Sequence, residues 1–214
     1  MPLYIHLSPA AQARVRDWYR EHCLDYEWWD SDYDHWKDKL SDLGFTDADI
    51  KFSGFCCQGD GASFTANVTR HFKLPDPIAA RIPEATAVAK VQRRFAGQTP
   101  VVDLSYDLSF RIERDSHDRY VHPYTIQAQF TLSCGDDLPE DLATQLETWA
   151  EELRQYLTSQ ARDLSDQIYR DLETEWNYVN SDEAIAETII ANDWSFDEDG
   201  DFLPDRRREL QAAA

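Results

Sequence analysis

The polar side chains most suited to chemistry gather around one glycine-rich turn. Gln58, Asp60 and Ser63 fall within the string Gln-Gly-Asp-Gly-Ala-Ser, and such glycines favour a tight hairpin connection. The glycines explain much of this string through the turn and the close approach of another backbone. The alternative is that the three side chains form a polar cluster at a sheet edge, able to bind a ligand or a partner. Hydrolysis would need a histidine base beside the Ser63 hydroxyl. His71 and His122 are the candidates, but no spacing pairs either with Ser63, so catalysis is the weaker interpretation.

The four cysteines form no metal-binding pattern. Cys23, Cys56, Cys57 and Cys134 show no Cys-x-x-Cys spacing. The adjacent pair falls in an expected strand, where neighbouring side chains point to opposite faces. We therefore expect free, mostly buried thiols in a reducing compartment, and no metal site. We expect no cofactor either, because the sequence has no phosphate-binding glycine loop, zinc-protease motif or Gly-x-Ser-x-Gly elbow.

Carboxylates dominate the charge, and they are unevenly spread. The chain has 214 residues, with 41 Asp and Glu against 21 Lys and Arg. Residues 50–135 hold eight acids and ten bases, whereas residues 136–205 hold 21 acids and three bases. A net charge of -20 disfavours direct binding to nucleic acid or to an anionic membrane.

Acids on one helical face can imitate a nucleic-acid backbone. Carboxylates one turn apart lie about 5–6 Å from each other, which is comparable to the phosphate step along one DNA strand. We expect two such faces. Their residues are Glu147, Glu151, Glu152, Asp163, Asp166, Asp171, Glu173 and Glu175 in the first, and Asp30, Asp32 and Asp34 in the second. The alternative is that these acids are only solvated, although a solvated helix usually mixes charges of both signs.

Hydrophobic patterns predict the elements that must position these residues. They predict an α+β fold, an antiparallel sheet of about four strands packed by N-terminal helices and long C-terminal helices. The expected helices cover residues 9–22, 25–43, 77–95, 138–176 and 181–190, and the expected strands residues 50–57, 62–70, 101–113 and 120–133. The long helix could break once near Thr158.

The chain is long enough for one domain with a real core. We expect a single α+β domain over residues 1–205 and a flexible tail over 206–214. Within the domain, residues 1–49 are expected to be helical, 50–135 to form the sheet with a crossover helix, and 136–205 to form acidic helices. No apolar run approaches the ~20 residues of a membrane helix, and the first residues lack a secretory signal pattern.

The segment from Asp49 to Phe64 resembles a motif found in small proteins of bacteriophages and prophages. The strings Phe-Ser-Gly-Phe and Gln-Gly-Asp-Gly-Ala-Ser-Phe carry the resemblance, and a short aromatic helix like that from Trp36 precedes them. The resemblance covers about residues 32–70. It implies a viral or mobile-element accessory protein in a bacterial host cytoplasm, and it assigns no catalytic residue.

Three functional hypotheses follow. The leading one is a non-enzymatic inhibitor of a host defence or DNA-processing protein, which acts as an acidic nucleic-acid mimic and is anti-CRISPR-like in principle. Its partner would be a basic nucleic-acid-binding host protein. The second is a small-ligand-binding or hydrolytic protein that uses the hairpin from Gln58 to Ser63. The third is a homo-oligomeric assembly protein that associates through the helix of residues 138–176.

Overall fold

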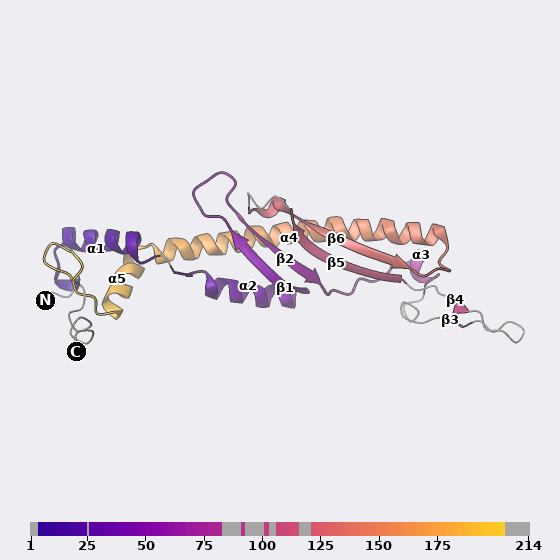
Figure 1. Cartoon of the computed structure of the whole chain (residues 1–214), viewed down its shortest axis with the longest axis horizontal. Helices are drawn as coiled ribbons and strands as arrows, with labels where there is room; N and C mark the ends of the chain where they lie inside the picture. The colour runs from indigo at the N-terminus through magenta and orange to yellow at the C-terminus, as the bar shows by residue number, and fades with distance from the viewer. Residues whose placement is uncertain are drawn as a thin grey trace, which may run out of the picture. The chain divides into compact units, whose positions relative to one another are not determined.

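The computed structural model describes residues 4–24, 26–82, 91–92, 101–102, 106–115 and 121–203. The helices are α1 (Pro9–His22), α2 (Asp30–Asp42), α3 (Asp76–Ala79), α4 (Glu140–Val179) and α5 (Asp182–Ala191), with 3-10 turns η1 (Tyr4–His6) and η3 (Pro123–Thr125). The strands are β1 (Phe45–Phe52), β2 (Ala62–Val68), β3 (Val91–Gln92), β4 (Val101–Val102), β5 (Tyr106–Arg114) and β6 (Ile126–Cys134). A four-stranded antiparallel sheet with packed helices confirms the expected α+β class (Figure 1).

Contacts within the chain divide it into two compact units. Residues 33–170 make up the sheet unit, and residues 1–32 with 171–214 make up the terminal unit. The sheet and most of α4 belong to the sheet unit, whereas α1, α5 and the isolated bridge between Phe196 and Phe202 belong to the terminal unit. The expectation of a single domain over residues 1–205 stays a prediction.

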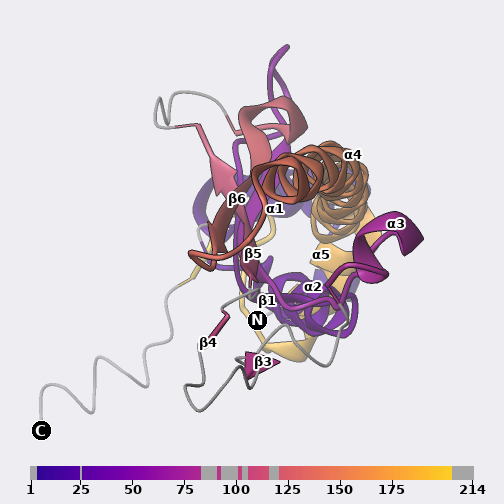
Figure 2. The same ribbon diagram turned by 90° about the vertical axis from the view of Figure 1, so that its right-hand side faces the viewer.

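The sheet has one apolar and one polar face, and its strand order is β1-β2-β5-β6. The β5 and β6 strands pair along their whole lengths. Side chains alternate accordingly: Phe110 and Ile112 are buried, while Ser109 and Arg111 between and beside them are exposed. A sheet of this kind needs helices on its apolar face only. Figure 2 shows α2 and α4 on the same side of the sheet.

The largest cover of the sheet is α4, a helix of 40 residues. Its first turns meet the sheet and the α3 region in one apolar cluster. The buried members of that cluster are Leu74, Ile78, Ile82, Leu142 and Leu146, and Tyr106 of β5 and Leu132 of β6 pack against them. Burying each leucine or isoleucine stabilises the fold by roughly 1.5–3 kcal/mol, so this seam fixes α4 on the sheet.

The side chain of Thr158 joins the middle of α4 to the edge of the sheet. Its hydroxyl donates to the Arg154 carbonyl oxygen at 2.8 Å and accepts the backbone N–H of Ala128 at 2.9 Å. Ala128 lies in β6, an edge strand whose outward side has no neighbouring strand among the residues that the structure describes. Arg162 likewise donates to the Ile126 carbonyl oxygen at 3.3 Å. The expected break near Thr158 is therefore wrong, because this threonine bonds to the sheet from within a continuous helix.

Several element ends differ from the sequence prediction. The strand expected over 50–57 is β1, which begins at Phe45 and ends at Phe52. The helix expected from residue 25 begins at Asp30. Residues 120–133 were expected to form one strand. Pro123 instead begins the 3-10 turn η3, and Tyr124 is 75% exposed.

The expected crossover helix over 77–95 is largely wrong. Within the described residues it is reduced to α3, which has four residues. Val91–Gln92 forms β3 and pairs with Val101–Val102, so the first residues of the expected strand 101–113 belong to a separate two-stranded sheet. The rest of the expected helix, residues 83–90 and 93–95, lies outside the described residues.

The terminal unit is built on two correctly predicted helices. Ser8 and Ser181 cap α1 and α5, each accepting a backbone N–H bond at 3.2 Å. The core of the unit holds Val15, Tyr19, Ile185, Ile189 and Phe196, with Trp18 and Trp194 packed against it. Asp182, in the first turn of α5, pairs with Arg16 at 3.0 Å and Arg20 at 2.6 Å. These arginines lower the pKa of the Asp182 carboxyl.

No helix within the described part of the chain combines the length and apolar character that a membrane span requires.

The Thr158 bond to the sheet edge predicts a measurable loss of stability. Replacing Thr158 by the near-isosteric Val leaves the buried N–H of Ala128 without its acceptor, which costs about 1–3 kcal/mol of unfolding free energy. Urea denaturation measures this. Thr148→Val is the matched control, because the Thr148 hydroxyl also donates to a carbonyl one turn back but lies exposed on the same helix. Equal effects of the two substitutions would contradict the edge-capping role.

Candidate functional site

The acids expected on α4 do not form a single face. A helix turns by about 100° per residue, so Glu147 and Glu151 lie about 40° apart, but Glu152 lies about 140° from Glu147. Glu152, Asp163 and Asp166 fall within about 60° of one another. All three are exposed. The expected acids therefore do not share one side of α4, and we call Glu152, Asp163 and Asp166 the acidic row.

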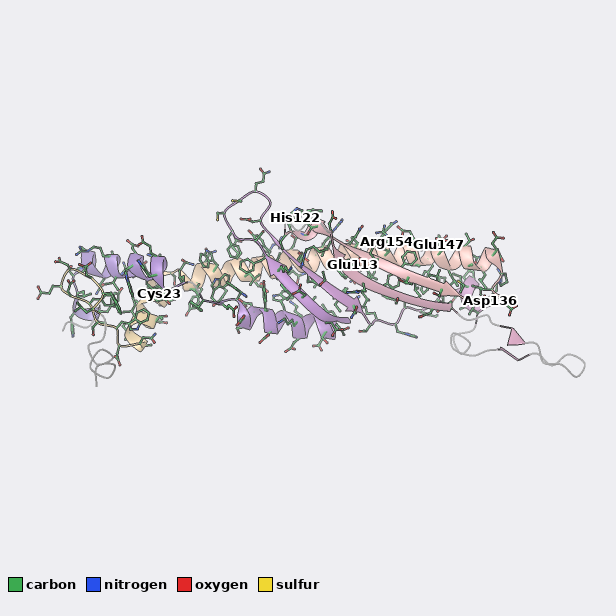
Figure 3. The ribbon with its side chains drawn as sticks, viewed as in Figure 1. Cys23, Glu113, His122, Asp136, Glu147 and Arg154 are labelled. Carbon is green, nitrogen blue, oxygen red and sulfur yellow. The ribbon has the colours of Figure 1, made fainter. Side chains whose placement is uncertain are left out.

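Glu151 is neutralised by its own helix. Its two carboxylate oxygens accept from Nε and one terminal nitrogen of Arg154, each at 2.7 Å. Gln155 Nε2 adds a third bond at 3.1 Å. The hydrogen bonds from Arg154 and then Gln155 lower the pKa of Glu151 to about 2. Figure 3 labels Arg154 and Glu147 at different positions along α4. Glu151 thus stays ionised, but its carboxylate is paired with Arg154 and is not available to a cationic group of a partner.

A shallow groove of about 520 Å³ borders the acidic row. Its lining residues are Tyr124, Gln127, Arg154, Gln155, Thr158, Ser159, Arg162, Asp163 and Asp166. Arg162 lies over the Tyr124 ring, 5.4 Å from its centroid, and bonds to the Ile126 carbonyl oxygen. Both arginines of the groove are therefore engaged by the protein itself, which leaves the carboxylates of Asp163 and Asp166 as its solvent-directed charges.

The remaining acids of the prediction differ in exposure. On α4, Asp171 and Glu173 are exposed, whereas Glu175 is half-buried. Burial raises the pKa of the Glu175 carboxyl, and the nearby charge of Asp32 raises it further. Asp32 of α2 is itself half-buried. These two acids are poorly placed to imitate solvent-exposed phosphates.

Asp30 and Asp34, the other two α2 acids of the predicted face, lie in the first turns of the helix and are exposed. Asp34 is 3.6 Å from the Lys37 ammonium group. Asp30 begins the helix, a position where a carboxylate is stabilised by the helix dipole. In the second expected face, Asp34 therefore has a cationic neighbour, and the Asp30 carboxylate interacts favourably with the dipole of its own helix.

The hairpin residues Gln58, Asp60 and Ser63 are not brought together as one site. Ser63 is fully buried in β2, where its hydroxyl accepts from Nε of Arg114 at 2.9 Å. Gln58 is exposed in the loop. Asp60 uses its carboxylate to hold the loop backbone. The Ser63 hydroxyl therefore has a structural partner, and the geometry gives no support to nucleophilic chemistry there.

The cysteines differ most from expectation. Cys56, Cys57 and Cys134 are exposed and Cys23 is half-buried, so the expectation of mostly buried thiols is wrong. The adjacent pair does not lie in a strand, because β1 ends at Phe52. Their sulfur atoms and a carboxylate oxygen of Asp60 all lie within 4.8 Å of one another. Neighbouring side chains point to opposite faces only in extended backbone, and Cys56 and Cys57 lie in a loop instead.

Comparison with known proteins defines a family but no activity. The model of a domain of unknown function, DUF8835, matches residues 28–182, so this chain belongs to that family. No curated protein and no solved structure matches the chain. The match covers β1 to α4, including the cysteine loop and the acidic row.

The pairing of Glu151 predicts a titration that nuclear magnetic resonance can follow. We expect a Glu151 pKa of about 2, because Arg154 holds the carboxylate. Arg154→Gln should return it toward the ordinary value of ~4.3. The contribution of the pair to stability is present above pH ~4.3 and is lost as the pH falls toward the folded pKa.

Arg162→Gln is the matched control for this titration, since Arg162 lies on the same helix but bonds to Ile126 instead. It should leave the Glu151 titration unchanged. An ordinary Glu151 pKa in the unmodified chain would show that the helix does not neutralise this acid.

Proposed function

We propose that this chain is a non-enzymatic inhibitor that occupies the basic nucleic-acid site of another protein. In this proposal the carboxylates of the acidic row take the place of phosphates. The observation that carries it is the state of Glu152, Asp163 and Asp166. They are exposed, and none forms an ion pair with another described residue.

The acidic row places three carboxylates along one side of α4 at two different spacings. Glu152 and Asp163 are eleven residues apart, which is about three turns and ~16.5 Å along the axis. Asp163 and Asp166 are neighbours, about 5–6 Å apart between Cβ atoms. Because the row lies on one continuous helix fixed to the sheet, binding would cost little ordering of the backbone.

The proposed interface contains fewer acids than the sequence hypothesis included. Glu151 is removed because Arg154 neutralises it, and Glu147 is removed because it faces a different side of α4. The resemblance over residues 32–70 supports the further proposal that the chain is a phage or mobile-element accessory protein. Its place of action would then be a bacterial host cytoplasm, and its target a defence or DNA-processing protein.

The two alternative functions receive less support. The hairpin alternative needs Ser63 in a shared site, but its hydroxyl is buried against Arg114. The assembly alternative needs a free apolar stripe on the long helix. In the sheet unit the apolar side chains Leu142, Leu146 and Leu157 of α4 are already buried within the chain. A homo-oligomer stays a prediction and would need another surface.

Charge reversal tests the acidic row. The tagged chain is used to capture proteins from bacterial lysate, the captured protein is identified by mass spectrometry, and its affinity is then measured with purified components. We expect a basic nucleic-acid-binding protein that salt or duplex DNA releases. Combined Glu152→Lys, Asp163→Lys and Asp166→Lys should weaken this complex about tenfold or more.

A matched control reverses three exposed acids of the terminal unit, Glu21, Glu187 and Glu198, to Lys. It changes the net charge equally and should leave the affinity nearly unchanged. Equal weakening by both triple variants would mean that only total charge matters. A complex that duplex DNA does not displace would contradict occupation of a nucleic-acid site.

A further inference from the structure

The loop of residues 53–61 brings two thiols and a carboxylate together at the surface. It connects β1 to β2 and carries Cys56, Cys57 and Asp60. The two cysteines are exposed and Asp60 is half-buried. One ligand atom from each lies within 4.8 Å of the other two. The loop thus contains three metal-ligand groups in one small volume, outside the acidic row.

The base of the loop is held on the body of the sheet unit. Ser53 N donates to the Gly61 carbonyl oxygen at 3.1 Å, and Ser53 Oγ donates to the Val121 carbonyl oxygen at 3.1 Å. Gly61 lies so close to His122 that an added Cβ would be 2.7 Å from the His122 Cβ atom. Phe55 contacts Tyr169 of α4, with ring centroids 5.3 Å apart. The residues on either side of the Cys56–Asp60 cluster are therefore held against the rest of the sheet unit.

The carboxylate of Asp60 organises the thiols. Its Oδ2 accepts the backbone N–H of Cys56 at 2.9 Å and of Cys57 at 2.7 Å. The Asp60 N–H in turn donates to the Cys57 carbonyl oxygen at 3.0 Å. Gly54 and Gly59, with φ of +121° and +109°, supply backbone conformations that side-chain-bearing residues rarely adopt. These bonds fold the backbone so that neighbouring cysteines share one side of the loop.

We propose that Cys56, Cys57 and Asp60 bind one thiophilic divalent cation, with Zn²⁺ as the reference metal. Two thiolates and one carboxylate give three protein ligands, and a fourth tetrahedral position stays open to water or to a ligand atom from a partner. Ligands on one tetrahedral Zn²⁺ lie about 3.5–3.8 Å apart, so atoms that already lie within 4.8 Å of one another need to close by at most about 1.3 Å. Binding releases the thiol protons to solvent, since thiolates are the ligands.

The donor set distinguishes this site from the many carboxylates of the chain. Oxygen-only clusters prefer Ca²⁺ and Mg²⁺, whereas thiolates select Zn²⁺, Cd²⁺ and Cu⁺. The acidic row contains no sulfur, so the metal proposal does not rest on the proposed function. Cys134 offers a built-in comparison, because it is an exposed thiol outside the cluster.

Metal titration of the full, reduced chain tests the proposal. Zn²⁺ affinity is measured by competition with a chromophoric chelator in excess Ca²⁺, which saturates oxygen-only sites. Cd²⁺ is used as the optical probe, through its thiolate-to-metal charge-transfer absorption. We expect one Zn²⁺ per chain. Cys56→Ser and Cys57→Ser should each lower the affinity about a hundredfold or more, and Asp60→Asn about tenfold or more.

Asp60→Asn is chosen because an amide oxygen can still accept the two backbone N–H bonds, so the loop keeps its fold. Cys134→Ser is the matched control and should bind Zn²⁺ as the unmodified chain does. Circular dichroism verifies that each variant is folded. The proposal is overturned if Zn²⁺ binding survives Cys56→Ser, if Cys134→Ser abolishes it, or if Asp60→Asn leaves it unchanged.

Discussion

The apolar face of the sheet must be kept from water, and the packing of α4 against it is the interaction on which the sheet unit depends. Leu142 and Leu146 bury their side chains in the cluster that Tyr106 and Leu132 join from the strands. Thr158 and Arg162 then satisfy backbone groups on the outer edge of β6. Apolar burial and edge bonding together fix which side of α4 faces inward. The exposure of Glu152, Asp163 and Asp166 follows from that choice.

Local signals were strong enough to predict most helices from the sequence. The starts of α1 and α5 carry local sequence signals, a serine followed by proline at Ser8 and a serine before two acids at Ser181, and such capping depends only on the adjacent turn. The alternation around Phe110 identified β5 for a similar reason. Its period of two needs no knowledge of distant residues.

Distant contacts explain what the sequence did not predict. Thr158 resembled a helix break, and only the position of the Ala128 N–H shows that its hydroxyl is used across the fold. The end of β1 at Phe52 depends on Asp60, whose carboxylate folds the following residues into a loop. The candidate metal site was missed for the same reason. A strand through Cys56 and Cys57 would have separated their sulfur atoms.

Charge within the chain is organised by pairing as well as by composition. The Glu151–Arg154 pair was visible as two opposite charges three residues apart, a spacing that allows contact on a helix. The sequence hypothesis, which counted acids alone, placed both Glu151 and Glu152 in the partner-binding face. The structure separates them, because one is neutralised within α4 and the other faces solvent. The same distinction removes the half-buried Asp32 and Glu175 from the proposed interface.

Carboxyl footprinting is the measurement that tests the role of the acidic row most directly. A carbodiimide with an amine probe labels exposed carboxylates, and mass spectrometry compares the chain alone with the chain bound to its captured partner. The account predicts strong protection of Glu152, Asp163 and Asp166, with Glu187 and Glu198 labelled equally in both states. Protection confined to the terminal unit, with the acidic row still fully labelled in the complex, would contradict it.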